Sequence, residues 1–281
     1  MDRLSEAISK ARAARGDTPA QAQAQTLPAV TGKAPVRRWH PEDITARWAA
    51  LKQVSLSRRQ LESSLIVAKD GGPASAPFDM LRTKVLHQMR TNGWRRIGIT
   101  SPLMGCGKST VALNLAFSFA RNPEIRTMLL DTDLRRPSIA TMLGITPTAS
   151  LFSVLAGRVT FEGCALAFGP NLCFATNGRP HRSPSELMQL SQVADELDRI
   201  DAEYEPDVML FDLAPILQTD DALSVLQKLD AVVIVAAAEV TSVKELDQCE
   251  ADVAANTNVL GVVLNKARNV GQNYGYGYAP S

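Results

Sequence analysis

The sequence of 281 residues predicts an α/β fold with a mostly parallel sheet flanked by helices on both faces. Short apolar runs alternate with helical patterns along most of the chain, and these runs are apolar at nearly every position. Strands of that kind are covered on both faces, as in parallel sheets with crossover helices. A glycine-rich turn also joins one run directly to a helix. Because ligands of such sheets bind at the carboxyl ends of the strands, we expect the functional site there.

The N-terminal part of the chain predicts a helix, a linker and an arm. Residues 1–15 carry apolar residues at helical spacing and predict a short amphipathic helix, which could dock to a partner or a membrane surface, or fray in solution. Residues 16–40 are rich in Ala, Gln, Thr and Pro and predict a flexible linker. Residues 41–63 predict a helical arm, residues 64–68 a strand, and residues 77–90 a helix.

Strands and helices then alternate regularly to the end of the chain. Strands are expected at residues 97–99, 127–131, 171–175, 207–212, 230–236 and 259–264. Helices are expected at residues 109–121, 183–200, 220–227 and 241–255. This alternation predicts one sizeable domain over residues 64–268, followed by a Gly- and Tyr-rich tail at residues 269–281.

The turn after residues 97–99 contains the sequence Gly-Cys-Gly-Lys-Ser-Thr, which is typical of a phosphate-binding loop. Glycine lets the backbone N–H groups approach a phosphate closely, and the helix that follows adds its positive dipole end. Lys108 supplies a charge for the outer phosphates, and the Ser109 hydroxyl can ligate magnesium. The expected phosphate contacts are Gly105, Cys106, Gly107, Lys108, Ser109 and Thr110.

The strict pattern of such loops has a glycine six places before the lysine, and Pro102 stands there. Only the Gly-Lys-Ser end therefore matches, and a chance Gly-Lys-Ser in a turn is the alternative. Together with the alternating strands and helices, the loop predicts a P-loop NTPase fold.

Aspartates stand at the ends of two expected strands. Asp131 and Asp133 close the strand at residues 127–131, and Asp212 closes the strand at residues 207–212. Two carboxylates one residue apart suit a hydrated magnesium ion and a proton-accepting base, and Asp212 can hold magnesium through water. A capping or turn role is the alternative for any one of them. Three aspartates downstream of a phosphate loop predict a nucleotide–magnesium site.

Composition excludes several other classes of protein. The net charge of +1 gives no electrostatic footprint for nucleic acid. No apolar run approaches the ~20 residues that span a bilayer, and the N-terminus lacks an apolar signal core, so a cytoplasmic location is expected. The four cysteines show no zinc spacing, and no serine-esterase or metalloprotease motif is present.

These motifs resemble those of the bacterial tyrosine kinases of exopolysaccharide and capsule synthesis, from about residue 78 to the C-terminus. The matching stretches are residues 81–83, 100–110 as Walker A, 130–137 as Walker A′, 183–188, 211–212 as Walker B, 220–222 and 261–266. The opening residues also look like the start of stand-alone members. The resemblance implies that residues 64–268 form an ATP-binding kinase domain, with ATP and Mg²⁺ as cofactors.

The resemblance assigns catalytic roles to Lys108, Asp131, Asp133 and Asp212. Lys108 would bind the phosphates and stabilise charge on the transferred γ-phosphoryl group. Ser109 and Asp131 would position magnesium directly or through water, and Asp212 would do so through water. Asp133 would orient or deprotonate the incoming phenol.

The resemblance also implies a substrate within the chain. Asn265 and Lys266 would lie near the base of the nucleotide, with a simple strand-end turn as the alternative. Three of the four tyrosines, Tyr274, Tyr276 and Tyr278, stand in the Gly-rich tail and would be the phosphoacceptors. The alternative is a tail that carries no phosphate. Phosphates added there would weaken subunit association by repulsion, which is a switch.

The family implies a homo-oligomer that phosphorylates its tails between subunits and regulates polysaccharide polymerisation and export. A membrane copolymerase that sets chain length would activate it and provide its only link to the inner membrane. The family's assembly motif, Glu-x-x-Arg-x-x-Arg, falls on Ala76, Asp79 and Arg82, so two of three residues differ, which argues against ring assembly by that route.

Two other functions fit the same fold. One is an ATP-binding switch or scaffold with little or no kinase activity. The other is a dimerising ATPase of the kind that positions division or partition machinery; those place a signature lysine five residues before the motif lysine, where this chain has Leu103.

Overall fold

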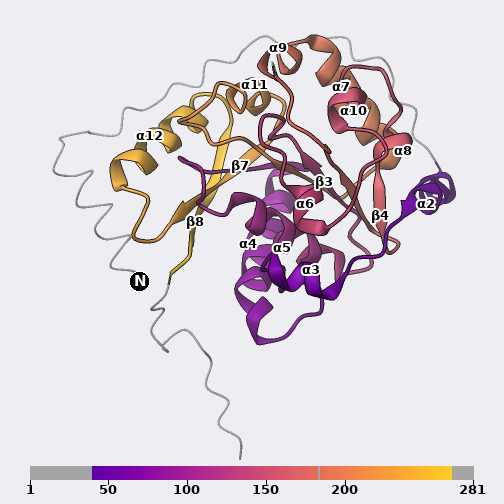
Figure 1. The fold of residues 1–281 in the computed structure, drawn as a ribbon, viewed down its shortest axis with the longest axis horizontal. Helices are drawn as coiled ribbons and strands as arrows, with labels where there is room; N and C mark the ends of the chain where they lie inside the picture. The colour runs from indigo at the N-terminus through magenta and orange to yellow at the C-terminus, as the bar shows by residue number, and fades with distance from the viewer. Residues whose placement is uncertain (1–39, 183, 268–281) are drawn as a thin grey trace, which may run out of the picture. The chain divides into compact units, whose positions relative to one another are not determined.

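The sheet has eight strands in the order β1-β4-β5-β3-β6-β2-β7-β8 (Figure 1). The computed structural model describes residues 40–182 and 184–267; the expected helix at residues 1–15, the linker up to residue 39 and the tail at residues 269–281 lie outside these ranges. The strands are β1 (Lys52–Gln53), β2 (Arg96–Thr100), β3 (Thr127–Asp131), β4 (Leu166–Phe168), β5 (Leu172–Ala175), β6 (Val208–Asp212), β7 (Ala231–Ala237) and β8 (Asn258–Asn265).

Every neighbouring pair in this sheet is parallel except β4 and β5. The mostly parallel sheet predicted from the sequence is therefore confirmed. The short strands β1 and β4 were not expected. Three residues separate β4 from β5, too few for a crossover, so this pair must run antiparallel.

Helices cover both faces of the sheet. They are α2 (Pro41–Ala50), α3 (Arg58–Ser63), α4 (Ala76–Asn92), α5 (Lys108–Ala120), α6 (Ile139–Leu143), α7 (Leu151–Leu155), α8 (Phe161–Cys164), α9 (Pro184–Met188), α10 (Ser191–Tyr204), α11 (Leu223–Leu226) and α12 (Val243–Ala254). Across the described ranges, no helix is both long enough and apolar enough to cross a membrane.

Alternate residues of the central strands feed two hydrophobic cores. In β3, Met128 and Leu130 pack in the core that includes α10 and α12, whereas Leu129 packs in the core with α4 and α5. Figure 1 shows these two pairs of helices on opposite sides of the sheet. Burial on both faces explains why the central strands are apolar at nearly every position.

Residues 41–63, expected as a helical arm, contain α2 and α3 with β1 between them. Trp48 of α2 is buried, and its indole Nε1 donates a hydrogen bond of 2.8 Å to the carbonyl oxygen of Tyr204. β1 pairs with β4 at one edge of the sheet. This segment is therefore tied to the same sheet and core as the residues that follow it.

Two expectations for secondary structure were wrong. Residues 64–68 form a loop, because the Oδ1 atom of Asn114 accepts hydrogen bonds from the N–H groups of Val67 and Ala68 at 2.8 and 3.0 Å, where a strand would need a neighbouring strand. The helix expected at residues 183–200 is divided into α9 and α10, because Leu190 adopts an extended conformation with ψ 140°.

Candidate nucleotide-binding site

The loop between β2 and α5 is held from the far side by the end of β8. Asn265 Nδ2 donates a hydrogen bond of 2.9 Å to the carbonyl oxygen of Cys106. Gly107 has a φ of +92°, and a Cβ atom there would stand 2.2 Å from Asn265 Nδ2. Position 107 therefore favours glycine for its backbone conformation, and any other side chain would also displace the Asn265 amide. The loop is preformed, and it delivers the chain into α5 at Lys108.

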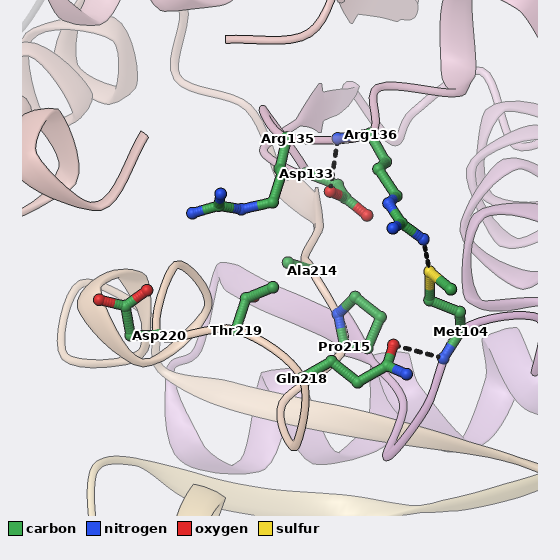
Figure 2. A pocket seen from close by; sticks show the side chains of 9 residues that line it. All are labelled: Met104, Asp133, Arg135, Arg136, Ala214, Pro215, Gln218, Thr219 and Asp220. Carbon is green, nitrogen blue, oxygen red and sulfur yellow. Dashed lines mark hydrogen bonds between the residues drawn. The ribbon is translucent and has the colours of Figure 1, made fainter. Parts of the chain in front are cut away.

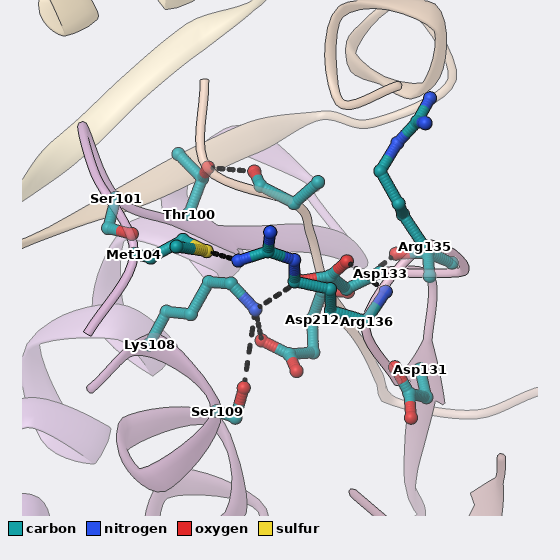
Figure 3. Close-up of polar contacts among 12 residues, drawn as sticks. Thr100, Ser101, Met104, Lys108, Ser109, Asp131, Asp133, Arg135, Arg136 and Asp212 are labelled. Atoms are coloured by element: carbon teal, nitrogen blue, oxygen red, sulfur yellow. Dashed lines mark hydrogen bonds and ion pairs between the residues drawn. The ribbon is translucent and has the colours of Figure 1, made fainter. Parts of the chain in front are cut away.

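Lys108 lies among the acidic strand ends. Its Nζ atom is 2.8 Å from Asp133 Oδ2, 3.4 Å from Asp212 Oδ1 and 3.3 Å from Ser109 Oγ (Figure 3). Burial by itself lowers the pKa of Lys108, but the carboxylates of Asp212 and Asp133 reverse this, and the net pKa is raised. Lys108 therefore stays positively charged, and an incoming anion must compete with the two carboxylates for its ammonium group.

Asp131 and Asp212 end adjacent parallel strands at directly paired positions. Both are fully buried, and neither Asp131 Oδ1 nor Asp212 Oδ2 has a hydrogen-bond partner among the described residues. Burial raises the pKa of both carboxyls; the charge of Asp212 raises that of Asp131 further, while Lys108 opposes the rise at Asp212. Unpartnered buried oxygens of this kind are costly unless a cation or water completes them.

The donor set fits a magnesium ion held mainly by other ligands. Within residues 40–182 and 184–267, no three His, Cys, Asp or Glu side chains are grouped closely enough to hold a metal alone. Magnesium keeps several waters and is bound by one or two carboxylates together with substrate phosphates. The Ser109 hydroxyl with the free oxygens of Asp131 and Asp212 matches that requirement, and the ion would offset the crowded negative charge.

A cavity of about 650 Å³ opens beside Asp133 (Figure 2). It is lined by Met104, Asp133, Arg135, Arg136, Ala214, Pro215, Gln218, Thr219 and Asp220. Asp133 is 3% exposed, and its carboxylate meets Lys108 on the side toward the phosphate loop. The carboxylate therefore separates the loop from the cavity, so a group entering the cavity can reach Asp133.

Several residues of this cavity have contacts that the sequence did not reveal. Arg135 forms a two-point ion pair with the buried Asp221, through Nε at 2.7 Å and Nη2 at 3.0 Å. Gln218 Oε1 accepts a hydrogen bond of 3.0 Å from the N–H of Met104 in the phosphate loop. Arg135 and Asp221 both lie in stretches that resemble the kinase motifs, residues 130–137 and 220–222. No other indication of a role for them is present in the sequence, because their ion pair depends on the fold.

The remaining expected site residues occupy different environments. Cys106 is buried, with Sγ 3.6 Å from Thr241 Oγ1. Thr110 is half-buried in α5, and its carbonyl oxygen accepts from Asn114 Nδ2 at 2.9 Å. Lys266 is exposed and has a φ of +61° just after β8. The three expected phosphoacceptor tyrosines lie outside the described residues.

The charged residues at the positions of the assembly motif, Asp79 and Arg82, form hydrogen bonds within the chain. Asp79 accepts hydrogen bonds from Ser118 Oγ at 2.6 Å, from Ser75 Oγ at 3.1 Å and from Arg121 Nη1 at 3.0 Å. Arg82 Nη1 donates to the carbonyl oxygen of Ser118 at 2.8 Å. These contacts join α4 to α5 and account for both charged residues of the motif.

Fold and loop together define a P-loop NTPase. The ParA family model, described as an NUBPL iron-transfer P-loop NTPase, matches residues 94–277, which is more than half of the chain. The chain therefore belongs to this family.

The chain is also similar to several bacterial proteins that are named tyrosine-protein kinases. YwqD of Bacillus subtilis, a tyrosine-protein kinase, is 29% identical over 206 residues, which cover 73% of this chain and 85% of YwqD. Wzc of Salmonella typhi, also a tyrosine-protein kinase, is 27% identical over 238 residues, or 81% of this chain and 32% of Wzc. The chain matches only 27% of the length of EpsB of Ralstonia nicotianae.

Solved structures share the fold of this chain. The chimeric protein CapA2B2 superposes with a TM-score of 0.66 at 26% identity, covering 81% of this chain and 99% of that one. The kinase domain of Escherichia coli tyrosine kinase ETK superposes with a TM-score of 0.67 at 22% identity, covering 85% and 100%, and shows a shared fold.

Proposed function

We propose that this chain is a Mg–ATP-dependent protein-tyrosine autokinase whose kinase domain spans residues 64–268 and whose substrates are Tyr274, Tyr276 and Tyr278. One observation carries the proposal: Lys108 and Asp133 meet at 2.8 Å where the phosphate loop adjoins the cavity. A donor phosphate held by Lys108 and an acceptor in the cavity would face each other across Asp133. The kinase relatives support this reading of the geometry.

Each residue has a defined part in the transfer. Lys108 would move from the carboxylates to the phosphates. Ser109 and Asp131 would hold magnesium directly or through water, Asp212 would hold it through water, and the ion would offset the charge of the phosphates. Asp133 orients the phenol and accepts its proton as the phenolic oxygen bonds to the γ-phosphorus. The bond from that phosphorus to the β,γ-bridging oxygen breaks, and ADP leaves with the electron pair. Removal of water and fixed charges supply most of the rate enhancement.

The biological role extends the same proposal. The kinase acts between subunits of a homo-oligomer, and phosphorylation of the tail weakens their association by adding roughly −1.5 to −2 charge per tyrosine. This cycle regulates polymerisation and export of a capsular or exopolysaccharide. A membrane copolymerase activates the kinase and links it to the inner membrane. Relatives such as Wzc extend well beyond the matched region.

The first experiment is intact-mass and tail-peptide mass spectrometry after incubation with ATP and magnesium, with and without a cytoplasmic peptide of a candidate copolymerase. Lys108→Met is compared with Lys244→Met, which changes an exposed lysine in the first turn of α12. Phosphate is expected on the three tail tyrosines in the wild type and in Lys244→Met, and not in Lys108→Met.

Measurable ATP binding with no phosphate on the tail, even with the partner peptide, would contradict the kinase. The same fold would then serve as a nucleotide-gated switch. In that case ATP-dependent association should persist after removal of the tail.

A further inference from the structure

Arg136 presents a cationic group to the cavity without an acidic partner. Its guanidinium contacts the thioether sulfur of Met104, which is only a weak hydrogen-bond acceptor. The side chain is exposed, and among the residues the structure describes it forms no ion pair. The neighbouring Arg135 differs, because Asp221 neutralises it through two hydrogen bonds. Of the two arginines that line this cavity, Arg136 is therefore the one without an acidic partner among the described residues.

Arg136 is held at a fixed place beside the proposed base. Its backbone N–H donates a hydrogen bond of 3.1 Å to Asp133 Oδ1, so the two residues share one turn. Figure 2 shows the Arg136 side chain extending toward Met104, while Arg135 extends away from it. The guanidinium itself contacts Met104, which stands in the phosphate loop.

Charge is distributed unevenly around the cavity. Asp220 is exposed and stands on the side opposite Met104 (Figure 2). Arg135 forms its ion pair with Asp221, and Asp220 forms no ion pair among the described residues. An anion entering beside Asp133 is therefore attracted to the Arg136 side and repelled from the Asp220 side. A planar guanidinium binds phosphate through two parallel hydrogen bonds, more specifically than a lysine would.

The tail sequence supplies a matching ligand. Tyr274, Tyr276 and Tyr278 are spaced two residues apart, and in an extended chain such side chains point the same way about 6.5–7 Å apart. Residues 268–281 contain no Asp or Glu, so phosphorylation of the tyrosines would give this segment anionic side chains that it otherwise lacks. A phosphotyrosine and the next free tyrosine could then occupy the Arg136 and Asp133 positions together.

We propose that Arg136 binds the phosphate of an already phosphorylated tail tyrosine and so presents the tyrosine two residues away to Asp133, an inference that rests on the proposed kinase function. Phosphorylation of the tail is then successive, because each phosphate makes the neighbouring tyrosine a better substrate, until the accumulated negative charge weakens the association of subunits. The first phosphate is added slowly, and the next ones follow faster. Arg136 is a specificity-determining residue in this scheme and takes no part in bond making.

The test uses the full chain with Tyr274→Phe, Tyr276→Phe and Tyr278→Phe, so that the tail does not compete with added peptides. Peptides of residues 268–281 carry no phosphate or one phosphotyrosine at position 274, 276 or 278. Binding is measured by fluorescence anisotropy with ADP and magnesium, where no transfer occurs. Phosphorylation is measured separately, as the ratio of kcat/KM for phosphorylated over unmodified peptide.

Arg136→Gln is compared with Arg90→Gln, which changes an exposed arginine of α4. At least one singly phosphorylated peptide should bind about tenfold more tightly than the unmodified one, and its kcat/KM ratio should rise by a similar factor. Both ratios should fall to about one in Arg136→Gln and stay near the wild-type value in Arg90→Gln.

The outcomes separate this inference from the kinase proposal. Equal binding of phosphorylated and unmodified peptides would overturn the inference, whether or not phosphate is transferred. A preference that persists in Arg136→Gln would also overturn it. Tighter binding that depends on Arg136, with no transfer to any peptide, would uphold the phosphotyrosine site and reject the kinase.

Discussion

Asp79 and Asp131 are both aspartates beside α5 or its loop, yet their surroundings are opposite. Asp79 accepts from two serine hydroxyls and from Arg121, and these hydrogen bonds outweigh its partial burial, so its pKa is lowered. Asp131 is fully buried beside the like charge of Asp212, one of its oxygens has no partner, and its pKa is raised. The Asp79 carboxylate thus has a hydrogen-bond partner for each oxygen, whereas one oxygen of Asp131 has none.

The difference separates structure from function in this molecule. A satisfied carboxylate lowers the free energy of the fold and has nothing left to offer a ligand. An unsatisfied buried carboxylate raises that free energy, and a cation or phosphate site can be the reason that it persists. Substitutions at the two kinds of position should therefore change the free energy of unfolding in opposite directions.

The largest effect is expected at Asp133, the proposed base. Asp133→Asn removes the proton acceptor, and phosphoryl transfer should fall by about 10²–10⁴-fold. ATP should still bind, because Lys108 and the phosphate loop are expected to hold the phosphates. Asp133 lies between Lys108 and the cavity proposed for the acceptor. Quantitative mass spectrometry of the tail and titration calorimetry with ATP measure the two effects. Asp195→Asn, an exposed position on α10, is the control. A wild-type rate in Asp133→Asn would remove this residue from the chemistry.

The second prediction compares the two aspartates directly, in nucleotide-free protein at neutral pH. Asp131→Asn keeps the oxygen that accepts from the Ile139 N–H and removes repulsion from Asp212, so the free energy of unfolding should rise by about 1–2 kcal/mol. Asp79→Asn weakens charge-assisted hydrogen bonds and should lower the free energy of unfolding by about 1–3 kcal/mol. Urea denaturation monitored by circular dichroism measures both. Two changes of the same sign would refute the comparison.

The third prediction concerns pH. An unfolded aspartate titrates near pH ~3.9. Because the folded pKa of Asp131 is raised, its stabilising contribution is complete below that pH and is lost as pH rises through the folded pKa. The gain from Asp131→Asn should therefore be absent near pH 4 and grow toward neutrality.

Asp79 should behave in the opposite way. Its folded pKa is lowered, so its contribution is present above the unfolded pKa and is lost as pH falls through the folded pKa. The deficit of Asp79→Asn should shrink on acidification below about pH 4. Urea denaturation repeated across this range measures both trends, and parallel pH profiles for the two variants would contradict the assigned shifts.

Local patterns in the sequence predicted the features that are encoded locally. The phosphate loop, the buried strands and the aspartates at their ends each depend on a few consecutive residues, and the parallel topology brings those strand ends to one edge of the sheet. Lys108, Asp133 and Asp212 therefore meet as expected, although their catalytic roles stay predictions.

Contacts between distant residues could not be predicted in this way. Asp221 pairs with Arg135 across 86 residues of sequence, and Asn265 reaches Cys106 across 159. The loop at residues 64–68 was taken for a strand because its apolar run gives no sign that Asn114 satisfies its backbone. The free charge of Arg136 also becomes visible only once Arg135 is known to be paired.

The smallest effect is expected at Asn265, which braces the phosphate loop from β8. Asn265→Ala removes the hydrogen bond to Cys106, and the affinity for ATP should fall by about three- to tenfold. Asn258→Ala is the matched control, because Asn258 makes a 2.8 Å hydrogen bond to Asp230 at the other end of the same strand. Calorimetry with ATP and with inorganic triphosphate separates two roles. Equal losses for both ligands indicate a brace for the loop, whereas a loss for ATP alone indicates contact with the base; unchanged affinity for both would show that the loop needs no brace.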